Sequence, residues 1–152
     1  MVFKTKIMTN NIKPLLFLVD DDALFLKTLE VELAQDVGFS IKTFATGEQC
    51  LENLSQNPDV IILDYYLNSV NTNAMDGIET LDKIFAVNPF IPVIILSVQD
   101  KIDVAINCMK HRAFDYIVKS ETSFIRLQKV IAYIIHNQKT EEALNWYMDR
   151  MS

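Results

Sequence analysis

The chain has 152 residues, half of them hydrophobic and 22% charged, and its 20 acidic and 14 basic residues give a net charge of −6. This length fits one globular domain, and the apolar runs are far shorter than the roughly 20 residues that a membrane span needs. The polar start has no signal-peptide core, so we expect a cytoplasmic protein, and the acidic excess argues against nucleic-acid binding.

Short apolar runs rich in β-forming residues predict five strands along the chain. Between them apolar residues recur at helical spacing, and Gly38, Pro58 and Pro89 follow the first three predicted helices. Cys50 and Cys108 lie within helical patterns, which favours buried free thiols over a disulfide or a zinc site. The predicted strands span residues 15–19, 41–44, 60–63, 93–96 and 116–118.

The alternation of strands and helices predicts an α/β fold, in which a parallel sheet is covered by helices on both faces. The run Ser40–Phe44 alternates polar and apolar residues, as expected for a strand at the sheet edge. We predict a flexible N-terminal segment over residues 1–14, the domain over 15–137 and a helical extension over 138–152. One face of that extension carries Leu144, Tyr147, Met148 and Met151.

Charged and polar residues follow the predicted strands, at the edge of a parallel sheet where ligands bind. Asp20 and Asp21 come after the first strand, Asp64 after the third, Ser97 after the fourth and Lys119 after the fifth. Three clustered carboxylates repel one another unless a cation offsets them. With Lys119 the cluster keeps a charge of −2, which suits Mg²⁺. The sequence therefore predicts a magnesium site at this edge.

The turn after the first predicted strand is acidic, and none of the three glycines of the chain lies there. An acidic turn repels the phosphate that a glycine-rich loop would bind, so nucleotide and flavin cofactors are disfavoured. Asp22, the third acid of this turn, is predicted to cap the following helix.

Five motifs stand at these strand ends: LLFLVDDDAL (15–24), DVIILDYYL (59–67), MDG (75–77), VIILS (93–97) and FDYIVK (114–119). In this order they resemble the receiver domain of two-component response regulators, over residues 15–137. The resemblance implies a doubly wound, five-stranded parallel sheet with the flavodoxin-like strand order 2-1-3-4-5. It also implies a signalling switch rather than a metabolic enzyme.

The resemblance assigns Asp64 as the phosphoacceptor, Lys119 as the lysine of the site, and Ser97 and Tyr116 as switch residues. A phosphoryl group adds negative charge and strong acceptors beside Lys119 and Ser97. Ser97 is then expected to turn toward it and Tyr116 to rotate inward. The surface of the fourth helix, fifth strand and fifth helix would change as a result.

By the same resemblance, Mg²⁺ would be bound by Asp21, Asp64 and the backbone carbonyl of Tyr66, with Asp20 acting through water. The implied partners are a sensor histidine kinase or phosphotransfer protein and a downstream effector protein or domain. Direct contact with nucleic acid or membrane is not expected of this segment. The resemblance also allows a phosphorylation-dependent homodimer.

The loop after the phosphoacceptor departs from the family pattern, because eleven residues separate Asp64 from Asp76. The extra stretch, residues 68–74, is rich in Asn, Ser and Thr and predicts an exposed polar loop. We hypothesise that it tunes the choice of kinase or phosphatase. Tyr66 flanks the path of hydrolytic water in the family, and its bulk suggests slow loss of phosphate.

Two further departures concern the backbone. Ser120 stands where the family has a proline joined by a cis bond, so the peptide after Lys119 is either a strained cis bond or trans. Arg112 stands where a glycine often ends the fourth helix, so that helix end needs another cap.

Two alternative functions stay open. A pseudo-receiver would keep the fold as an interaction module without using phosphate, which the altered loop and Ser120 leave open. A Mg²⁺-dependent phosphohydrolase of the haloacid-dehalogenase type would use Asp20 and Asp22 as its Asp-x-Asp pair, with Asp20 phosphorylated. Leu24 replaces the Thr or Val of that pattern, and Asp64 would have no role.

Overall fold

The computed structural model of the protein describes residues 13–35 and 38–151. The predicted N-terminal segment lies outside the described residues except for Lys13 and Pro14. The elements are β1 (Leu15–Val19), α1 (Ala23–Ala34), β2 (Ser40–Phe44), α2 (Gly47–Glu52), the short 3-10 helix η1 (Leu54–Gln56), β3 (Val60–Asp64), α3 (Gly77–Val87), β4 (Val93–Ser97), α4 (Ile102–Lys110), β5 (Asp115–Val118) and α5 (Ser123–Met151).

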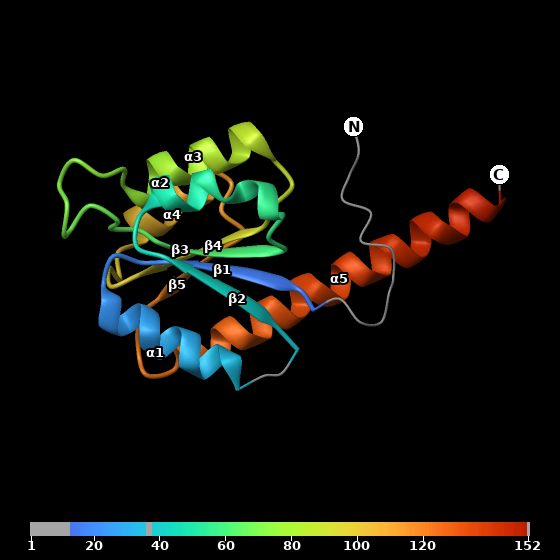
Figure 1. The fold of residues 1–152 in the computed structure, drawn as a ribbon, viewed down its shortest axis with the longest axis horizontal. Coiled ribbons are helices and arrows are strands. Elements are labelled where there is room, and N and C mark those ends of the chain that lie inside the picture. The colour runs from blue at the N-terminus through green and yellow to red at the C-terminus, as the bar shows by residue number, and fades with distance from the viewer. Residues whose placement is uncertain (1–12, 36–37, 152) are drawn as a thin grey trace.

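The sheet is parallel throughout and has the order β2-β1-β3-β4-β5. The α/β fold and the strand order are therefore confirmed. Figure 1 shows α2, α3 and α4 on one face of the sheet and α1 and α5 on the other. β3 and β4 are buried along their whole length, whereas β2 is partly exposed and lies at the edge, as its alternating sequence predicted.

Two apolar cores lie on opposite faces of the sheet, because successive strand residues point to opposite sides. Phe17 and Ile61 belong to the core under α2, α3 and α4, and Leu16 and Ile62 to the core under α1 and α5. This double burial explains why the central strands are continuous apolar runs. The central strands β3 and β4 are thus covered on both faces, and their polar side chains, Asp64 and Ser97, lie at the strand ends.

The two cysteines are buried free thiols, as predicted. Burial raises the pKa of the Cys50 thiol to about 12 and that of Cys108 to about 11. Both thiols are therefore protonated at neutral pH and behave as small apolar side chains of the core.

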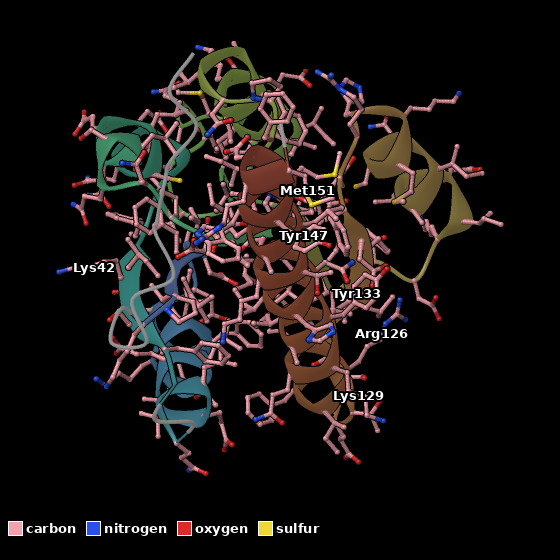
Figure 2. All side chains as sticks on the ribbon, turned by 90° about the vertical axis from the view of Figure 1, so that its right-hand side faces the viewer. Lys42, Arg126, Lys129, Tyr133, Tyr147 and Met151 are labelled. Atoms are coloured by element: carbon pink, nitrogen blue, oxygen red, sulfur yellow. The ribbon has the colours of Figure 1, made fainter. Side chains whose placement is uncertain are left out.

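Helix α5 is one continuous helix of 29 residues, so residues 138–151 form its second half. The side-chain amide of Gln138 donates to the backbone carbonyl of Asp59 at 3.2 Å. Figure 1 shows that the C-terminal part of α5 extends beyond the rest of the domain. Tyr133, Tyr147 and Met151 lie along one side of this helix (Figure 2) and are more than half exposed. No described helix is both long and apolar enough to cross a membrane.

The turn after α4 has an arginine, not a glycine, in the left-handed conformation. Arg112 itself takes the left-handed conformation, with φ 69°, and its N–H donates to the carbonyl of Met109. The guanidinium of Arg112 lies 5.2 Å from the centre of the Phe85 ring, a favourable cation–π contact. The arginine therefore adopts a backbone form that favours glycine, with the ring contact as partial compensation.

Candidate functional site

Three carboxylates meet at the carboxyl edge of the sheet, as predicted. Asp20 and Asp21 follow β1 and Asp64 ends β3, and the pairing of Val19 with Leu63 brings the two strand ends side by side. One oxygen of each acid lies within 4.8 Å of the others. Asp20 and Asp64 are only 3% and 6% exposed, so their charges are poorly screened by water.

Lys119 joins this cluster from the end of β5. Its Nζ lies 2.8 Å from Oδ2 of Asp20 and 3.3 Å from Oδ1 of Asp64. Its backbone N–H donates to the carbonyl of Ser97 at 2.7 Å. No cis peptide bond occurs among residues 13–35 and 38–151. Lys119 therefore reaches both acids through a trans bond to Ser120.

The ring of Phe25 is a contact of Lys119 that the sequence reasoning missed. Nζ lies 4.1 Å from the ring centre, so the ammonium group rests on the aromatic face. Phe25 comes from α1, five residues after Asp20. Apolar spacing in a helix predicts only that such a residue packs inward, and nothing in the sequence pairs it with a lysine almost a hundred positions later.

The charges of these groups are strongly linked. Burial, followed by the charge of Asp20, raises the pKa of Asp64 to about 7, although Lys119 acts in the opposite direction. Burial alone would lower the pKa of Lys119, but its hydrogen bond to Asp20 and the charges of Asp64 and Asp20 outweigh burial and raise it. Lys119 therefore stays charged at neutral pH. A large fraction of Asp64 stays protonated there unless more positive charge is added beside it.

Asp20 has both carboxylate oxygens engaged. Oδ1 accepts the backbone N–H of Asp22 at 2.9 Å, and Oδ2 accepts Nζ of Lys119. The carboxylate of Asp22 points elsewhere and accepts the N–H groups of Leu24 and Phe25, which confirms it as the cap of α1. Of the three acids in this turn, only Asp20 and Asp21 are thus aimed at the cluster.

Asp21 is bound by the loop that the sequence marked as an insertion. Its Oδ2 accepts the backbone N–H of Ser69 at 2.9 Å and that of Val70 at 3.0 Å. The hydroxyl of Ser69 donates to the backbone carbonyl of Tyr66 at 3.1 Å. The loop was predicted to be exposed over residues 68–74. Residues 69–73 are exposed, but Asn68 is only partly exposed and Ala74 is buried, and the start of the loop is bonded to the acidic cluster. Bonds donated by backbone N–H groups of a distant segment do not depend on residue type, so the sequence could not predict them.

The donor set fits a hard divalent cation. The cluster offers carboxylate oxygens within 4.8 Å of one another, the ligands that Mg²⁺ prefers. An added cation would also offset the excess negative charge that Lys119 leaves unpaired, and so would favour the ionised form of Asp64. The residues present therefore fit the magnesium site predicted from the sequence.

Ser97 and Tyr116 are both hydrogen-bonded to the backbone of Gln99, in the loop between β4 and α4. Ser97 is fully buried at the end of β4, and its Oγ accepts the backbone N–H of Gln99 at 3.1 Å. The hydroxyl of Tyr116 donates to the carbonyl of the same Gln99. Burial raises the pKa of the Tyr116 phenol, an effect that the Ser97 hydroxyl opposes. Tyr116 is buried, with 9% of its surface exposed.

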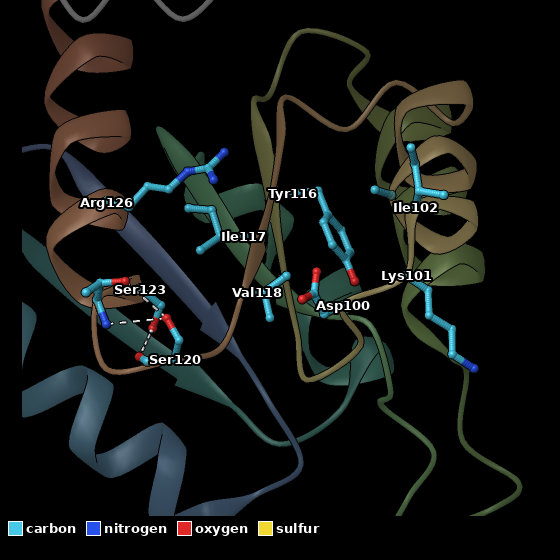
Figure 3. Close-up of a pocket in the computed structure, with 11 residues that line it drawn as sticks. Asp100, Lys101, Ile102, Tyr116, Ile117, Val118, Ser120, Ser123 and Arg126 are labelled. Carbon is cyan, nitrogen blue, oxygen red and sulfur yellow. Dashed lines mark hydrogen bonds between the residues drawn. The ribbon is translucent and has the colours of Figure 1, made fainter.

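A cavity of about 420 Å³ lies beside Tyr116, between the starts of α4 and α5 and over β5. Figure 3 shows Tyr116 on the side of this cavity that faces α4, and Arg126 on the opposite side. Arg126 pairs with Asp115 at 3.1 Å. Ile102, at the start of α4, is 75% exposed. The surface predicted to change on phosphorylation is thus hollow, partly apolar and directly beside the tyrosine.

Comparison with known proteins agrees with this geometry. A family model described as the response regulator receiver domain matches residues 16–132. The DNA-binding transcriptional regulator NtrC of Escherichia coli (strain K12) is 32% identical over 132 residues, which cover 86% of this chain and 27% of that protein. The transcriptional regulatory protein ZraR of Klebsiella oxytoca is 30% identical over 128 residues, which cover 84% of this chain and 28% of that protein.

The fold also matches a solved structure. The signal receiver domain of a putative Luxo repressor protein from Vibrio parahaemolyticus superimposes with a TM-score of 0.76 over 88% of this chain and 98% of that one. The two are 24% identical, so this likeness concerns the fold alone. The present chain spans less than a third of the length of the two regulators above.

Proposed function

Because this chain belongs to the family of response regulator receiver domains, we propose that it is a phosphoacceptor switch, phosphorylated on Asp64 with Mg²⁺ by a histidine kinase or phosphotransfer protein. The observation that carries the proposal is the contact of Lys119 with Asp20 and Asp64 inside a cluster of three carboxylates. An isolated surface lysine would not be held between two buried acids, each at the end of a different strand.

The chemistry follows from what these side chains offer. An oxygen of ionised Asp64 attacks the phosphorus of a phosphohistidine, the new O–P bond forms as the N–P bond breaks, and the imidazole leaves with the bonding electrons. Lys119 faces the oxygens that carry the transferred charge. Mg²⁺, when bound, would supply the remaining positive charge. Asp20 holds Lys119 in place through the bond at 2.8 Å.

The output would pass through Ser97 and Tyr116. The Ser97 hydroxyl is the donor expected to turn to the phosphoryl group, and such a turn would end its bond with the N–H of Gln99. Gln99 also accepts the Tyr116 hydroxyl, so this movement would disturb the loop between β4 and α4. We expect an effector protein, or a domain of the same protein, to read the change at the cavity beside Tyr116.

The two alternatives have less support. A dehalogenase-type phosphohydrolase would use an oxygen of Asp20 for attack, but Oδ1 of Asp20 accepts the N–H of Asp22 and Oδ2 accepts Nζ of Lys119. A pseudo-receiver does not bind a phosphoryl group, so its function does not require a lysine held between two buried acids. The phosphoacceptor switch therefore remains the better proposal, and one experiment separates the three.

The test is intact-mass analysis after incubation with Mg²⁺ and acetyl phosphate, with wild type, Asp64→Asn and Asp20→Asn compared. We expect a Mg²⁺-dependent gain of one phosphoryl group that disappears only in Asp64→Asn. A gain that survives there and disappears in Asp20→Asn would indicate the phosphohydrolase. No gain, together with no fluorescence change on adding BeF₃⁻ and Mg²⁺, would indicate the phosphate-independent module.

A further inference from the structure

Ser69 touches two groups at once. Its backbone N–H donates to Oδ2 of Asp21 at 2.9 Å, and its hydroxyl donates to the carbonyl of Tyr66 at 3.1 Å. Under the proposed function both acceptors, the Asp21 carboxylate and the Tyr66 carbonyl, would bind Mg²⁺. One residue of the inserted loop, residues 68–74, therefore links two ligands that come from the ends of β1 and β3.

The loop is placed to act on the metal rather than merely to cover the site. Ser69 and Val70 donate to the same oxygen of Asp21, and no hydrogen bond within the described part of the chain engages Oδ1, which can therefore face a cation. A backbone carbonyl has two lone pairs, so the Tyr66 oxygen can accept the Ser69 hydroxyl and still face a cation. Hydrogen bonds of this kind orient metal ligands, and their removal typically weakens binding by about 10-fold or more.

The far end of the loop is also tied down. The backbone N–H of Met75 donates to Oε2 of Glu48 at 3.2 Å, and the N–H of Ala74 donates to the carbonyl of Asn71 at 3.0 Å. The loop therefore has one anchor on α2 and one on the acidic cluster. Of these, only the anchor on the cluster involves groups that a cation would also contact.

We propose that Ser69 is a positioning residue of the magnesium site, and that Mg²⁺ binding and the conformation of loop 68–74 are thermodynamically linked. This rests on the proposed function, because it requires that Mg²⁺ binds at Asp21 and Tyr66. With the loop docked, Asp21 and Tyr66 are held ready for the cation. By linkage, the cation in turn holds the loop in its docked form.

The first experiment measures Mg²⁺ affinity by calorimetry for wild type, Ser69→Ala and Ser69→Thr. We expect Ser69→Ala to bind Mg²⁺ about 10-fold more weakly and Ser69→Thr, which keeps a hydroxyl, to recover most of the loss. Thr72→Ala is the matched control, since it removes an exposed hydroxyl of the same loop. Equal or tighter binding by Ser69→Ala would overturn the proposal, because the hydroxyl would then be neutral or a competitor.

A second pair of variants probes the backbone bond. Val70→Pro removes the N–H that donates to Asp21, whereas Val70→Ala keeps it; the side chain itself is 78% exposed. We expect Mg²⁺ affinity to fall only in Val70→Pro. A merely structural role would instead lower the unfolding midpoint of Val70→Pro and Ser69→Ala in EDTA, which we expect to stay near that of wild type.

Hydrogen exchange supplies a readout that needs no variant. If the linkage holds, Mg²⁺ slows amide exchange over residues 68–74 of the full chain, and faster exchange would mean that the cation displaces the loop. Failure of the two proposals is distinguishable. A wild-type chain that binds no Mg²⁺ would overturn the metal-dependent function and this inference together, whereas normal binding with unchanged variants would overturn this inference alone.

Discussion

Gly77 packs directly against the backbone of Asp64. A Cβ atom at Gly77 would lie 2.5 Å from the carbonyl oxygen of Asp64 and 2.6 Å from that of Tyr65, closer than such atoms approach in folded proteins. The N–H of Gly77 donates to the Tyr65 carbonyl at 3.0 Å. The start of α3 therefore packs on the end of β3, the strand that carries the proposed phosphoacceptor Asp64.

We predict that Gly77→Ala destabilises the fold by about 1–3 kcal/mol, because the methyl group must push backbone atoms apart. It should also slow phosphorylation by acetyl phosphate, since the end of β3 would shift. Urea unfolding and intact-mass time courses measure the two effects. Val87→Ala, at an exposed position of the same helix, is the control. A fully stable, fully reactive Gly77→Ala would contradict the packing argument.

The raised pKa of Asp64, about 7, predicts a pH-dependent stability. Between about pH 4 and 7 the folded chain holds a proton on Asp64 that the unfolded chain has lost, so stability falls as pH rises through this window. Without Mg²⁺, Asp64→Asn should therefore be more stable than wild type by about 2–4 kcal/mol at pH 8, and the difference should vanish near pH 4. Urea unfolding in EDTA at several pH values tests this, and a pH-independent difference would refute it.

Lys119→Met should leave two buried carboxylates without their ammonium partner. We expect a loss of about 3 kcal/mol in the free energy of unfolding at pH 8 in EDTA. Saturating Mg²⁺ should restore more stability to this variant than to wild type, because the site then carries one more negative charge. Unfolding with EDTA and with Mg²⁺ measures both quantities. Lys83→Met, at an exposed lysine of α3, should change neither by more than about 0.5 kcal/mol.

Tyr66→Asn should shorten the lifetime of the phosphorylated form. Tyr66 is 37% exposed, its ring packs edge to face on Tyr65, and its backbone N–H is hydrogen-bonded to the Asp64 carboxylate. A smaller, polar side chain would open that approach to water. The decay of the phosphorylated mass after removal of acetyl phosphate measures the lifetime. Tyr147→Asn on the exposed part of α5 is the control, and an unchanged lifetime in Tyr66→Asn would count against the proposed shielding.

Much of the site could be predicted because it depends on strand ends. Asp20, Asp64, Ser97 and Lys119 each directly follow or end an apolar run, and parallel strands bring such residues to one edge whatever the loops do. The capping role of Asp22 was predictable for a different reason, because an N-cap side chain bonds only to backbone N–H groups two or three residues later in the sequence. The parallel sheet, its edge strand and the buried thiols likewise follow from local patterns of apolar residues.

The rest needed the tertiary structure, because it depends on contacts between segments distant in sequence. Three contacts join residues whose types do not predict one another: the ring of Phe25 on Lys119, the backbone of Gly77 on Asp64 and the N–H of Ser69 on Asp21. The burial of Tyr116 and the trans bond after Lys119 also depend on how the surrounding segments pack. The sequence by itself determined which charges gather at the sheet edge, since the alternation of strands and helices makes the strands parallel and their carboxyl ends then meet at one edge. Only the tertiary structure decided how those charges are held, since that depends on the folded path of the loops.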